Sequence, residues 1–367
     1  MTTHVDDSLF LRLAFTQGVG AQTAHKLLRE LGDIHAVFGA GAASLERIVH
    51  APLARKITAL PDAATQLKID ETIAWLTSAV DHHLLTWAHP SYPKALLASD
   101  DAPFAIYAKG RIELLSRPAI AMVGSRNCSQ GGTDTAEAFA QAFAENRVTV
   151  VSGMALGIDA ASHMGAMRAK GSDCGSTIAV IGTGIDRVYP ARNKVLAHSI
   201  AGLGLMLSEY PLGTPPLPAN FPKRNRIISG LSLGVLVVEA SMQSGSLITA
   251  RLAGEQGREV FAIPGSIHST FHKGCHHLIK QGAKLVESAN DVLEELRLET
   301  LASASETTAE NMAKTGLLKF IEHTPIDVDT LVARSSMPVD QIVTELTMLE
   351  LDGSIESMPG GRWQRRG

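Results

Sequence analysis

From residue 119 onward the chain repeats short apolar runs that are separated by longer amphipathic stretches. The apolar runs cover residues 119–124, 148–153, 177–182, 205–209, 234–239 and 259–265, and a weaker run follows at 284–288. They are rich in Val, Ile and Ala without polar alternation, which is typical of parallel strands that are buried on both faces. The stretches between them are long enough for crossover helices. The pattern therefore predicts an α/β fold with a doubly wound, mainly parallel sheet.

The segments that flank this repeat have different patterns. Residues 9–79 read as helical, with turns near Gly18, Gly32 and Gly39. GVGAQTAHKLL at residues 18–28 resembles a helix-hairpin-helix element, whose turn offers backbone N–H groups to a phosphate, although an ordinary small helical bundle explains it equally well. Two short strands, HLLTW and FAIYAKG, are expected after residue 82.

The C-terminal part contains a linker and a small domain. Residues 298–312 have few branched or aromatic side chains and read as the linker. The order of helices and a final hairpin in 313–367 is that of a winged helix. We therefore predict a helical domain at 1–80, a Rossmann-like domain at 81–297, this linker, and a winged-helix domain at 313–367.

Composition sets limits on the class of protein. The 367 residues carry a net charge of −4, so a site for a polyanion must be local. The three cysteines are far apart in sequence, a pattern that fits a reducing compartment and not a disulfide framework. The first residues are acidic and do not resemble a signal peptide, and no apolar run reaches the roughly 18–20 residues that cross a bilayer. We expect a cytoplasmic protein without membrane insertion.

Residues 220–250 carry the most informative chemistry. A turn with Lys223, Arg224 and Arg226 has no acidic neighbour in its own sequence segment, and it precedes the apolar run that ends at Glu239. The chain then passes through Ser244-Gly245-Ser246 into a helix that we expect to begin near Leu247. Small residues at a helix N-terminus present N–H groups and a positive dipole end to an anion. The segment therefore predicts a ligand that carries phosphate.

Other small-residue loops follow the neighbouring strands, at the edge of the sheet where such folds bind ligands. These loops are Gly124-Ser125-Arg126, Ser152-Gly153 with Gly157 and Asp159, and Gly182-Thr183-Gly184 with Asp186. Together with Gly245 and Ser246 they are expected to form a broad shelf of backbone donors, to which Arg126 adds a bidentate cation.

The same sequence offers three other interpretations. A dinucleotide site is disfavoured because Arg187 occupies the third glycine position in GTGIDR. A metal site at His268, His272, Cys275, His276 and His277 is disfavoured because adjacent histidines on a helix point to different faces. A nucleotide phosphoribohydrolase remains the enzymatic alternative, with Glu239 or Asp159 as its carboxylate. Glu255, the next glutamate after Gly245, comes too late in the sequence to enter the same pocket.

These motifs also carry a family resemblance. GSR, SGMALGIDAASH, GTGIDRVYP, SEYPLG, NFPKRNRIISGLS, EASMQSGSLITA and FAIPG occur in this order between about residues 83 and 288, and they resemble the DNA-processing protein A (DprA, Smf) family. The resemblance implies a non-enzymatic, cytoplasmic homodimer without a cofactor. Such a protein binds single-stranded DNA without sequence preference, protects incoming DNA and loads the RecA recombinase onto it in natural transformation.

The resemblance also implies roles for individual residues. Gly124, Ser125 and Arg126 are expected to receive a backbone phosphate, and Phe221, Lys223, Arg224 and Asn225 to line the same pocket. Phe221 would stack on a base. The residues expected to shape the pocket are Ser152, Gly153, Gly157, Asp159, Gly245 and Ser246. Two departures from the family pattern are a longer loop at 169–177 and His277 at a position usually held by asparagine.

In the winged helix, the fold favours DNA binding, whereas the charge of its helix disfavours it. A recognition helix normally lies in a major groove. Residues 335–353 contain Asp340, Glu345, Glu350 and Asp352 but no Lys or Arg, so groove binding would bring like charges together. We therefore expect a protein-contact or regulatory domain, the alternative being a domain that only packs against the sheet.

Overall fold

A computed structural model describes residues 4–97, 101–171, 176–298, 317, 320–321, 326–335, 337–351, 354–358 and 361–365. The chain divides into two compact units, residues 1–300 and 301–367, and each is described by itself. The predicted linker beyond residue 298 and residues 172–175 of the longer loop lie outside the described residues. The helical segment and the sheet belong to one compact unit, so the boundary at residue 80 stays a prediction.

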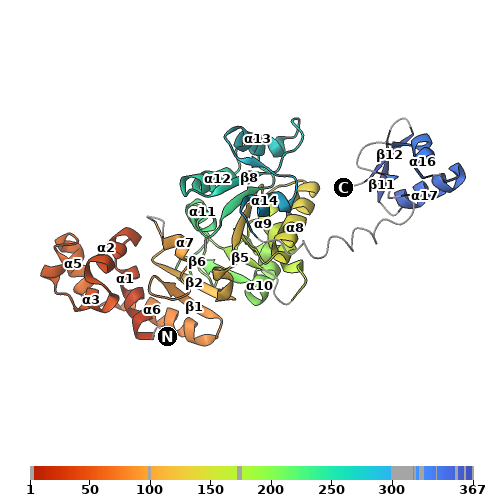
Figure 1. The fold of residues 1–367 in the computed structure, drawn as a ribbon. Coiled ribbons are helices and arrows are strands. Elements are labelled where there is room, and N and C mark those ends of the chain that lie inside the picture. The colour runs from red at the N-terminus through yellow and green to blue at the C-terminus, as the bar shows by residue number, and fades with distance from the viewer. Residues whose placement is uncertain are drawn as a thin grey trace. The chain divides into compact units, whose positions relative to one another are not determined.

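The first unit is organised around a nine-stranded sheet with the strand order β1-β2-β6-β5-β4-β3-β7-β8-β9 (Figure 1). Strands β3 to β9 pair in parallel, whereas β1 pairs antiparallel with β2 and β2 antiparallel with β6. This confirms the predicted doubly wound, mainly parallel sheet. The strands are β1 (His82–Thr86), β2 (Ala105–Gly110), β3 (Ala119–Val123), β4 (Thr149–Ser152), β5 (Thr177–Val180), β6 (Leu205–Ser208), β7 (Gly234–Val237), β8 (Glu259–Ala262) and β9 (Lys284–Leu285).

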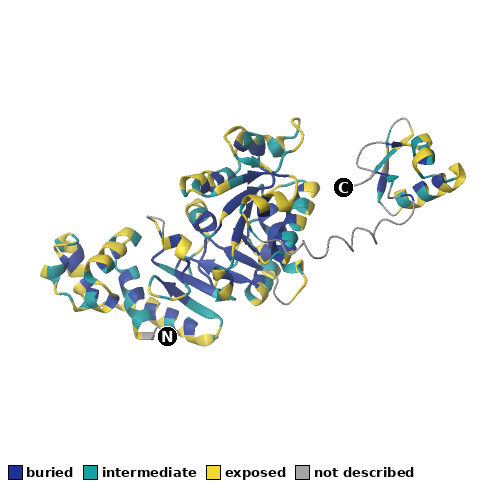
Figure 2. Cartoon of the chain, in the orientation of Figure 1, coloured by how far each residue is buried: buried dark blue, intermediate teal, exposed yellow. Residues whose placement is uncertain are grey.

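Successive residues of each central strand point into two different cores. In β3, Ile120 and Met122 pack with the helices α8, α9 and α14, whereas Ala121 and Val123 pack with α11, α12 and α13. The central strands are therefore buried on both faces, as Figure 2 shows, which explains their unbroken apolar runs. These helices are α8 (Gln130–Glu145), α9 (Ile158–Arg168), α11 (Asn220–Gly230), α12 (Ser246–Glu255), α13 (Lys273–Lys280) and α14 (Ala289–Glu295), and α10 (Lys194–Leu203) packs near β6.

The N-terminal helices form their own apolar cluster, to which Phe104 of the sheet region contributes. Helix α2 begins directly after Gly18-Val19-Gly20, and Gly18 has a φ of +98°, a conformation that glycine adopts readily. The expected glycine turn and the helix after it are present, while the helix-hairpin-helix assignment and contact with DNA there stay predictions. The helices of this cluster are α1 (His4–Phe15), α2 (Ala21–Leu31), α3 (Ile34–Gly39), α4 (Ala42–Leu45) and α5 (Ala51–Thr58), whereas α6 (Ala63–Ser78) and α7 (Lys94–Leu97) pack in the clusters of the sheet.

The second unit has winged-helix elements, in agreement with the predicted order. Helices α16 (Val328–Ser335) and α17 (Val339–Leu351) precede the hairpin of β11 (Ile355–Met358) and β12 (Arg362–Arg365). Strand β10 (Ile326–Asp327) pairs with the other edge of β12. Across the described part of both units, no helix is long and apolar enough to cross a membrane.

Candidate nucleic-acid interface

An open cavity of about 630 Å³ lies at the carboxyl ends of β3 and β7. The first turns of α11 and α12 form part of its wall, so segments that are far apart in sequence meet as the motifs predicted. Of the sequence-predicted residues, the cavity is lined by Gly124, Ser125, Arg126, Asp159, Phe221, Arg224, Asn225, Gly245 and Ser246, and not by Ser152, Gly153, Gly157 or Lys223.

The loop at residues 124–126 is held closely against its neighbours. The Ser125 N–H donates to the Glu239 carbonyl at 2.7 Å, and the Ser125 carbonyl accepts from the Ile158 N–H at 3.2 Å. A Cβ on Gly157, whose φ is +75°, would lie 2.3 Å from the Ser125 carbonyl oxygen. A Cβ on Gly124 would lie 2.6 Å from the Ile158 side chain. Both glycines are therefore required for this close packing, which fixes the position of the cavity wall.

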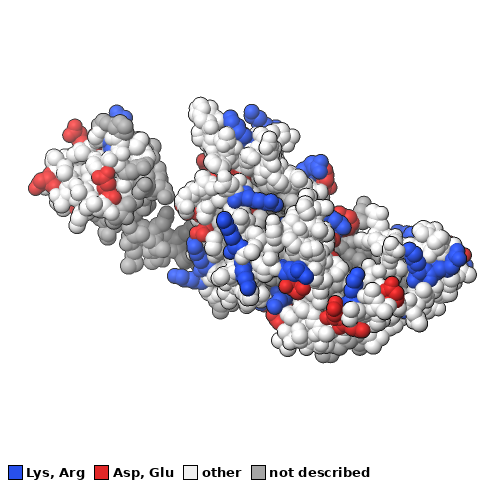
Figure 3. All heavy atoms as spheres, turned by 180° about the vertical axis from the view of Figure 1, so that it is seen from behind, with Lys and Arg blue, Asp and Glu red and all other residues white. Residues whose placement is uncertain are grey.

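Arg126 is the exposed cation of this cavity, at the tip of that loop. Its guanidinium can donate two parallel hydrogen bonds to a phosphate, which a lysine cannot do. On the face of the first unit drawn in Figure 3, Lys and Arg side chains gather over the central region with few acidic side chains among them. A local positive surface thus exists on a chain whose net charge is −4.

Arg224 differs from Arg126 because it is 5% exposed. One of its terminal nitrogens donates to the Gly153 carbonyl at 2.8 Å and also contacts the Val180 carbonyl. Burial lowers the pKa of Arg224 to about 10, and the neighbouring Asp159 carboxylate partly offsets that effect. The guanidinium therefore stays charged at neutral pH, but its main contacts are with the ends of β4 and β5 beneath the cavity.

Asp159 is the second buried charged residue near Arg224, and it is 8% exposed. Its Oδ2 accepts from the N–H groups of Gly153 at 3.2 Å and Ala155 at 3.3 Å. Burial raises the pKa of Asp159, while the charge of Arg224 and these N–H groups lower it. The carboxylate thus fixes the loop after β4, which is a structural task.

The expected cationic turn is the first part of helix α11, which corrects the sequence-based view of that segment. Pro222 is compatible with a helix at this position because the first turn needs no N–H from it. Arg226 is not free of acidic neighbours: it pairs with Glu209 at 2.5 Å and with Asp101 at 3.2 Å. Sequence reasoning missed both partners because they come from other segments.

Lys223 is exposed but lies outside the cavity of Arg126. It lines a second cavity of about 730 Å³, which also includes Gly20 and the first turn of α2. Lys223 therefore does not line the cavity of Arg126, and its contact with DNA stays a prediction. Neighbouring residues on a helix point in different directions, and the sequence alone did not show which of them faces β3.

The N-terminus of α12 also differs in detail from the expected shelf of free donors. The helix begins at Ser246, one residue before the expected start. Its first N–H groups are used locally: that of Ser246 donates to the Ser244 Oγ at 3.4 Å, and that of Leu247 to the Ser244 carbonyl at 3.2 Å. This wall of the cavity is therefore polar and closely approachable, but Arg126 provides the exposed charge.

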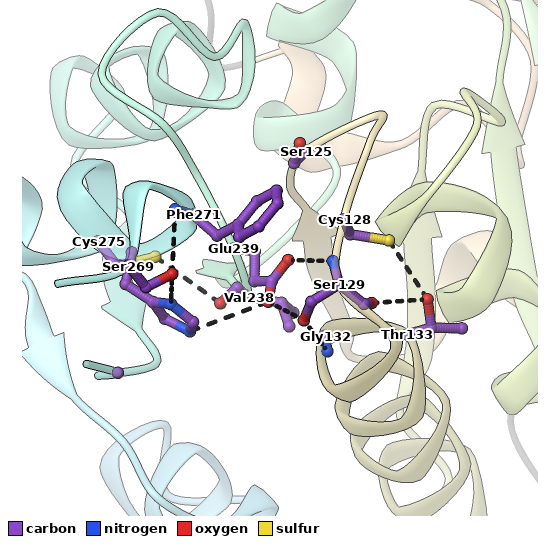
Figure 4. Close-up of polar contacts among 12 residues, drawn as sticks. Ser125, Cys128, Ser129, Gly132, Thr133, Val238, Glu239, Ser269, Phe271 and Cys275 are labelled. Atoms are coloured by element: carbon purple, nitrogen blue, oxygen red, sulfur yellow. Dashed lines mark hydrogen bonds and ion pairs between the residues drawn. The ribbon is translucent and has the colours of Figure 1, made fainter.

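Glu239, one candidate carboxylate for hydrolysis, is 1% exposed and does not line the cavity. Its side chain accepts from the Ser129 N–H at 2.9 Å and from the Ser129 Oγ at 2.5 Å, as Figure 4 shows. A Cβ on Gly132 would lie 2.4 Å from its carboxyl carbon. Glu239 therefore anchors the start of α8 and is not placed to attack or protonate a ligand in the cavity.

The histidine-rich segment at 268–277 has packing contacts of its own. His276 lies 3.0 Å from the Gly265 carbonyl, and Cys275 is buried, which raises the pKa of its thiol to about 11. Among the described residues, no group of three or more His, Cys, Asp or Glu side chains is arranged to hold a metal ion. His277 is exposed, and its effect at the usual asparagine position stays a prediction.

The loop Gly182-Thr183-Gly184 does not line the cavity but contacts Phe221 and Asn220 at the start of α11. A Cβ on Gly182 would lie 2.9 Å from the Phe221 ring, so this glycine makes room for the aromatic side chain. The Asn220 side chain donates to the Gly182 carbonyl at 3.1 Å. Residues that line the cavity but that the sequence had not suggested include Asn127, Tyr189, Pro216, Pro218, Pro222 and Gln243.

The fold and this cavity define an α/β protein with a local site suited to an anionic ligand that also offers aromatic surface. Comparison with known proteins gives the family. The family model for "DNA recombination-mediator protein A" matches residues 83–297. The model for "DprA winged helix domain" matches residues 301–361. The chain belongs to the DNA recombination-mediator protein A (DprA/Smf) family.

Individual relatives agree with this assignment. Protein Smf of Escherichia coli K12 is 42% identical over 309 residues, covering 80% of this chain and 80% of that protein. The DNA processing protein DprA of Streptococcus pneumoniae R6 is 52% identical over 204 residues, covering 56% of this chain and 71% of that protein.

Solved structures are similar as well. The X-ray structure of DprA from Streptococcus pneumoniae has a TM-score of 0.63 and 39% identity, covering 79% of this chain and 97% of that one. DNA processing protein A from Helicobacter pylori has a TM-score of 0.52 and 29% identity, covering 59% of this chain and 96% of that one; its structure is described as showing a single-stranded DNA binding mode.

Proposed function

We propose that this chain binds single-stranded DNA without sequence preference in the cavity at the carboxyl ends of β3 and β7. The observation that carries the proposal is that the exposed Arg126 and the Phe221 ring line the same cavity. A guanidinium recognises the phosphate that every nucleotide has, and an aromatic ring stacks on any base. Membership of the family and the single-stranded DNA binding described for the relative from Helicobacter pylori support the same ligand.

In this proposal the residues have different roles. Gly124, Ser125 and Arg126 receive a backbone phosphate, and Phe221 stacks on a base while Asn225 offers an amide beside it. Arg224 acts mainly from beneath the cavity, by positioning the ends of β4 and β5 and by adding positive potential. Lys223 contacts the strand outside this cavity, because it lines the neighbouring one.

Competition measured by fluorescence anisotropy tests the proposal. Labelled oligo-dT is bound to the full chain and then displaced with unlabelled single strands of different sequence or with duplex DNA. We expect single strands of each sequence to displace the probe at similar concentrations, and duplex to need a clearly higher one. Equal displacement by duplex, or the absence of binding to oligo-dT, would contradict the proposal.

The enzymatic alternative has less support. Glu239 anchors α8, and Asp159 accepts hydrogen bonds from two N–H groups near the charge of Arg224, so neither carboxylate is free to act on a glycosidic bond. We therefore propose a non-enzymatic role without a cofactor. Incubation with nucleoside monophosphates should release no free base above the blank. Steady release that stops in a Glu239→Gln variant would support the hydrolase instead.

We also propose that the chain is a cytoplasmic homodimer that protects incoming DNA and loads the RecA recombinase onto it in natural transformation. The support is membership of the family and the single-strand site. Light scattering after gel filtration measures the oligomeric state, and a single mass equal to one chain would contradict the dimer. For loading, the full chain should shorten the lag before RecA hydrolyses ATP on single strands coated with a single-strand-binding protein, and an unchanged lag would contradict it.

A further inference from the structure

Tyr189 is an aromatic residue at this cavity to which neither the sequence motifs nor the proposed function assign a role. It lines the cavity and is 47% exposed, an unusually open position for a large aromatic side chain. Its ring centroid lies 5.3 Å from that of Phe221, with 39° between the ring planes. The cavity thus has two neighbouring aromatic surfaces, which come from different segments of the chain.

The backbone on both sides of Tyr189 is fixed. On the N-terminal side, the Thr183 Oγ1 donates to the Arg187 carbonyl at 2.9 Å, and the Asp186 side chain accepts from the Gly213 N–H at 2.9 Å. On the C-terminal side, the buried Asn193 side chain donates to the Met154 carbonyl at 2.9 Å. A half-exposed ring on a fixed loop loses little conformational freedom when a ligand stacks on it.

Phe221 is fixed in a similar way. Asn220 is tied to the Gly182 carbonyl, and the Tyr210 hydroxyl donates to the Asn220 carbonyl at 3.1 Å. The absence of a side chain on Gly182 gives the Phe221 ring its place. The two rings are therefore positioned as a stacking surface before a ligand binds. A flexible pair of rings would lose conformational entropy on binding.

We propose that Tyr189 is a second base-stacking residue of the single-strand site and that it contributes to the preference for single strands over duplex. This inference rests on the proposed function. An unpaired base can turn its face onto the Tyr189 ring while a neighbouring base contacts Phe221, whereas bases inside a duplex are already stacked on their neighbours. Since every base has such a face, the contact adds affinity without sequence preference.

The test compares Tyr189→Ala and Tyr189→Phe in the full chain, with binding to oligo-dT and to duplex measured by anisotropy. Removal of the ring is expected to weaken oligo-dT binding about tenfold and duplex binding much less. Tyr189→Phe keeps the ring and should bind nearly as the parent does. Val195→Ala on α10, at a side chain that is 80% exposed and does not line the cavity, is the control.

A strand of the same length with abasic sites separates stacking from phosphate contact. The parent should lose affinity on the abasic strand, and Tyr189→Ala should lose clearly less, because the base and the ring act as a pair. The inference is overturned when Tyr189→Ala binds oligo-dT as the parent does, or when it loses the same factor on abasic and normal strands. If the parent itself does not bind oligo-dT, the proposed function is wrong, and the inference about Tyr189 falls with it.

Discussion

Replacing Arg224 with alanine distinguishes a phosphate-binding role from a structural role, which the sequence alone could not do. A phosphate contact would weaken DNA binding and leave the fold unchanged. The structure instead places Arg224 at 5% exposure, bonded to strand-end carbonyls and next to Asp159, which is 8% exposed. Removing Arg224 leaves the buried Asp159 carboxylate without the positive charge that offsets its burial, and an uncompensated buried charge typically costs about 3–5 kcal/mol. We expect Arg224→Ala to lower the free energy of unfolding of the first unit by about that amount.

Urea unfolding of the parent, Arg224→Ala and Arg126→Ala measures the effect. Arg126 is exposed, so its removal should change the free energy of unfolding by no more than about 0.5 kcal/mol. Adding Asp159→Asn to Arg224→Ala removes the unpaired carboxylate, so the double variant should lose less than the sum of the single variants.

The pH dependence gives a second check on the same pair. In Arg224→Ala, Asp159 loses the nearby charge that lowers its pKa, so burial raises that pKa further. A carboxyl whose folded-state pKa lies above its unfolded value destabilises the fold above that pKa, and the penalty disappears when the group is protonated. The difference in the free energy of unfolding between parent and variant should therefore narrow as the pH falls and Asp159 takes up its proton. A variant that unfolds as the parent does, while its DNA affinity alone falls, would refute this reasoning.

Three further predictions concern other parts of the chain. Glu239→Gln should lower the free energy of unfolding by about 1–3 kcal/mol, because the amide NH2 cannot accept and one of the two Ser129 donors loses its acceptor. The folded variant should bind oligo-dT as the parent does, and a selective loss of binding would contradict the anchoring role. Burial lowers the pKa of His163 to about 3, so only the unfolded chain takes up its proton between about pH 6.5 and 3, and stability falls with decreasing pH there. His163→Gln should make that fall shallower in urea titrations at several pH values, and an unchanged slope would contradict it. A chain ending after Leu298 keeps the first unit and should lose less than about tenfold in single-strand affinity, because α17 carries Asp340, Glu345 and Glu350 but no Lys or Arg. A folded truncated chain that loses nearly all DNA binding would contradict that view of the second unit.

Much of the fold could be predicted because strands that are buried on both faces have an apolar amino-acid composition. Central strands with apolar residues on both faces, such as β3 and β7, have unbroken Val, Ile, Leu, Met and Ala runs. The antiparallel pairing of β2 with β6 was not visible, since it depends on contacts between segments about a hundred residues apart.

The sequence predicted which loops meet at the cavity but not the directions of their side chains. Arg224 and Arg126 are equally cationic in sequence, yet Arg224 turns inward to carbonyls of residues 153 and 180, and nothing near residue 224 in the sequence indicates these partners. Lys223, its neighbour on the same helix, points to another cavity. Tyr189 was missed for a related reason: its ring lies beside that of Phe221, which comes 32 positions later in the sequence.

The salt dependence of oligo-dT binding tests the central claim most directly. Removing one cation that binds a phosphate of the single strand should flatten the plot of log affinity against log salt by about 0.7. We predict this change for Arg126→Ala, similar for every strand sequence, with an unchanged urea midpoint. Arg55→Ala is the matched control, because Arg55 is an exposed arginine of α5 that lines neither cavity. If Arg126→Ala folds normally and binds oligo-dT with the affinity and salt slope of the parent, the cavity is not the single-strand site.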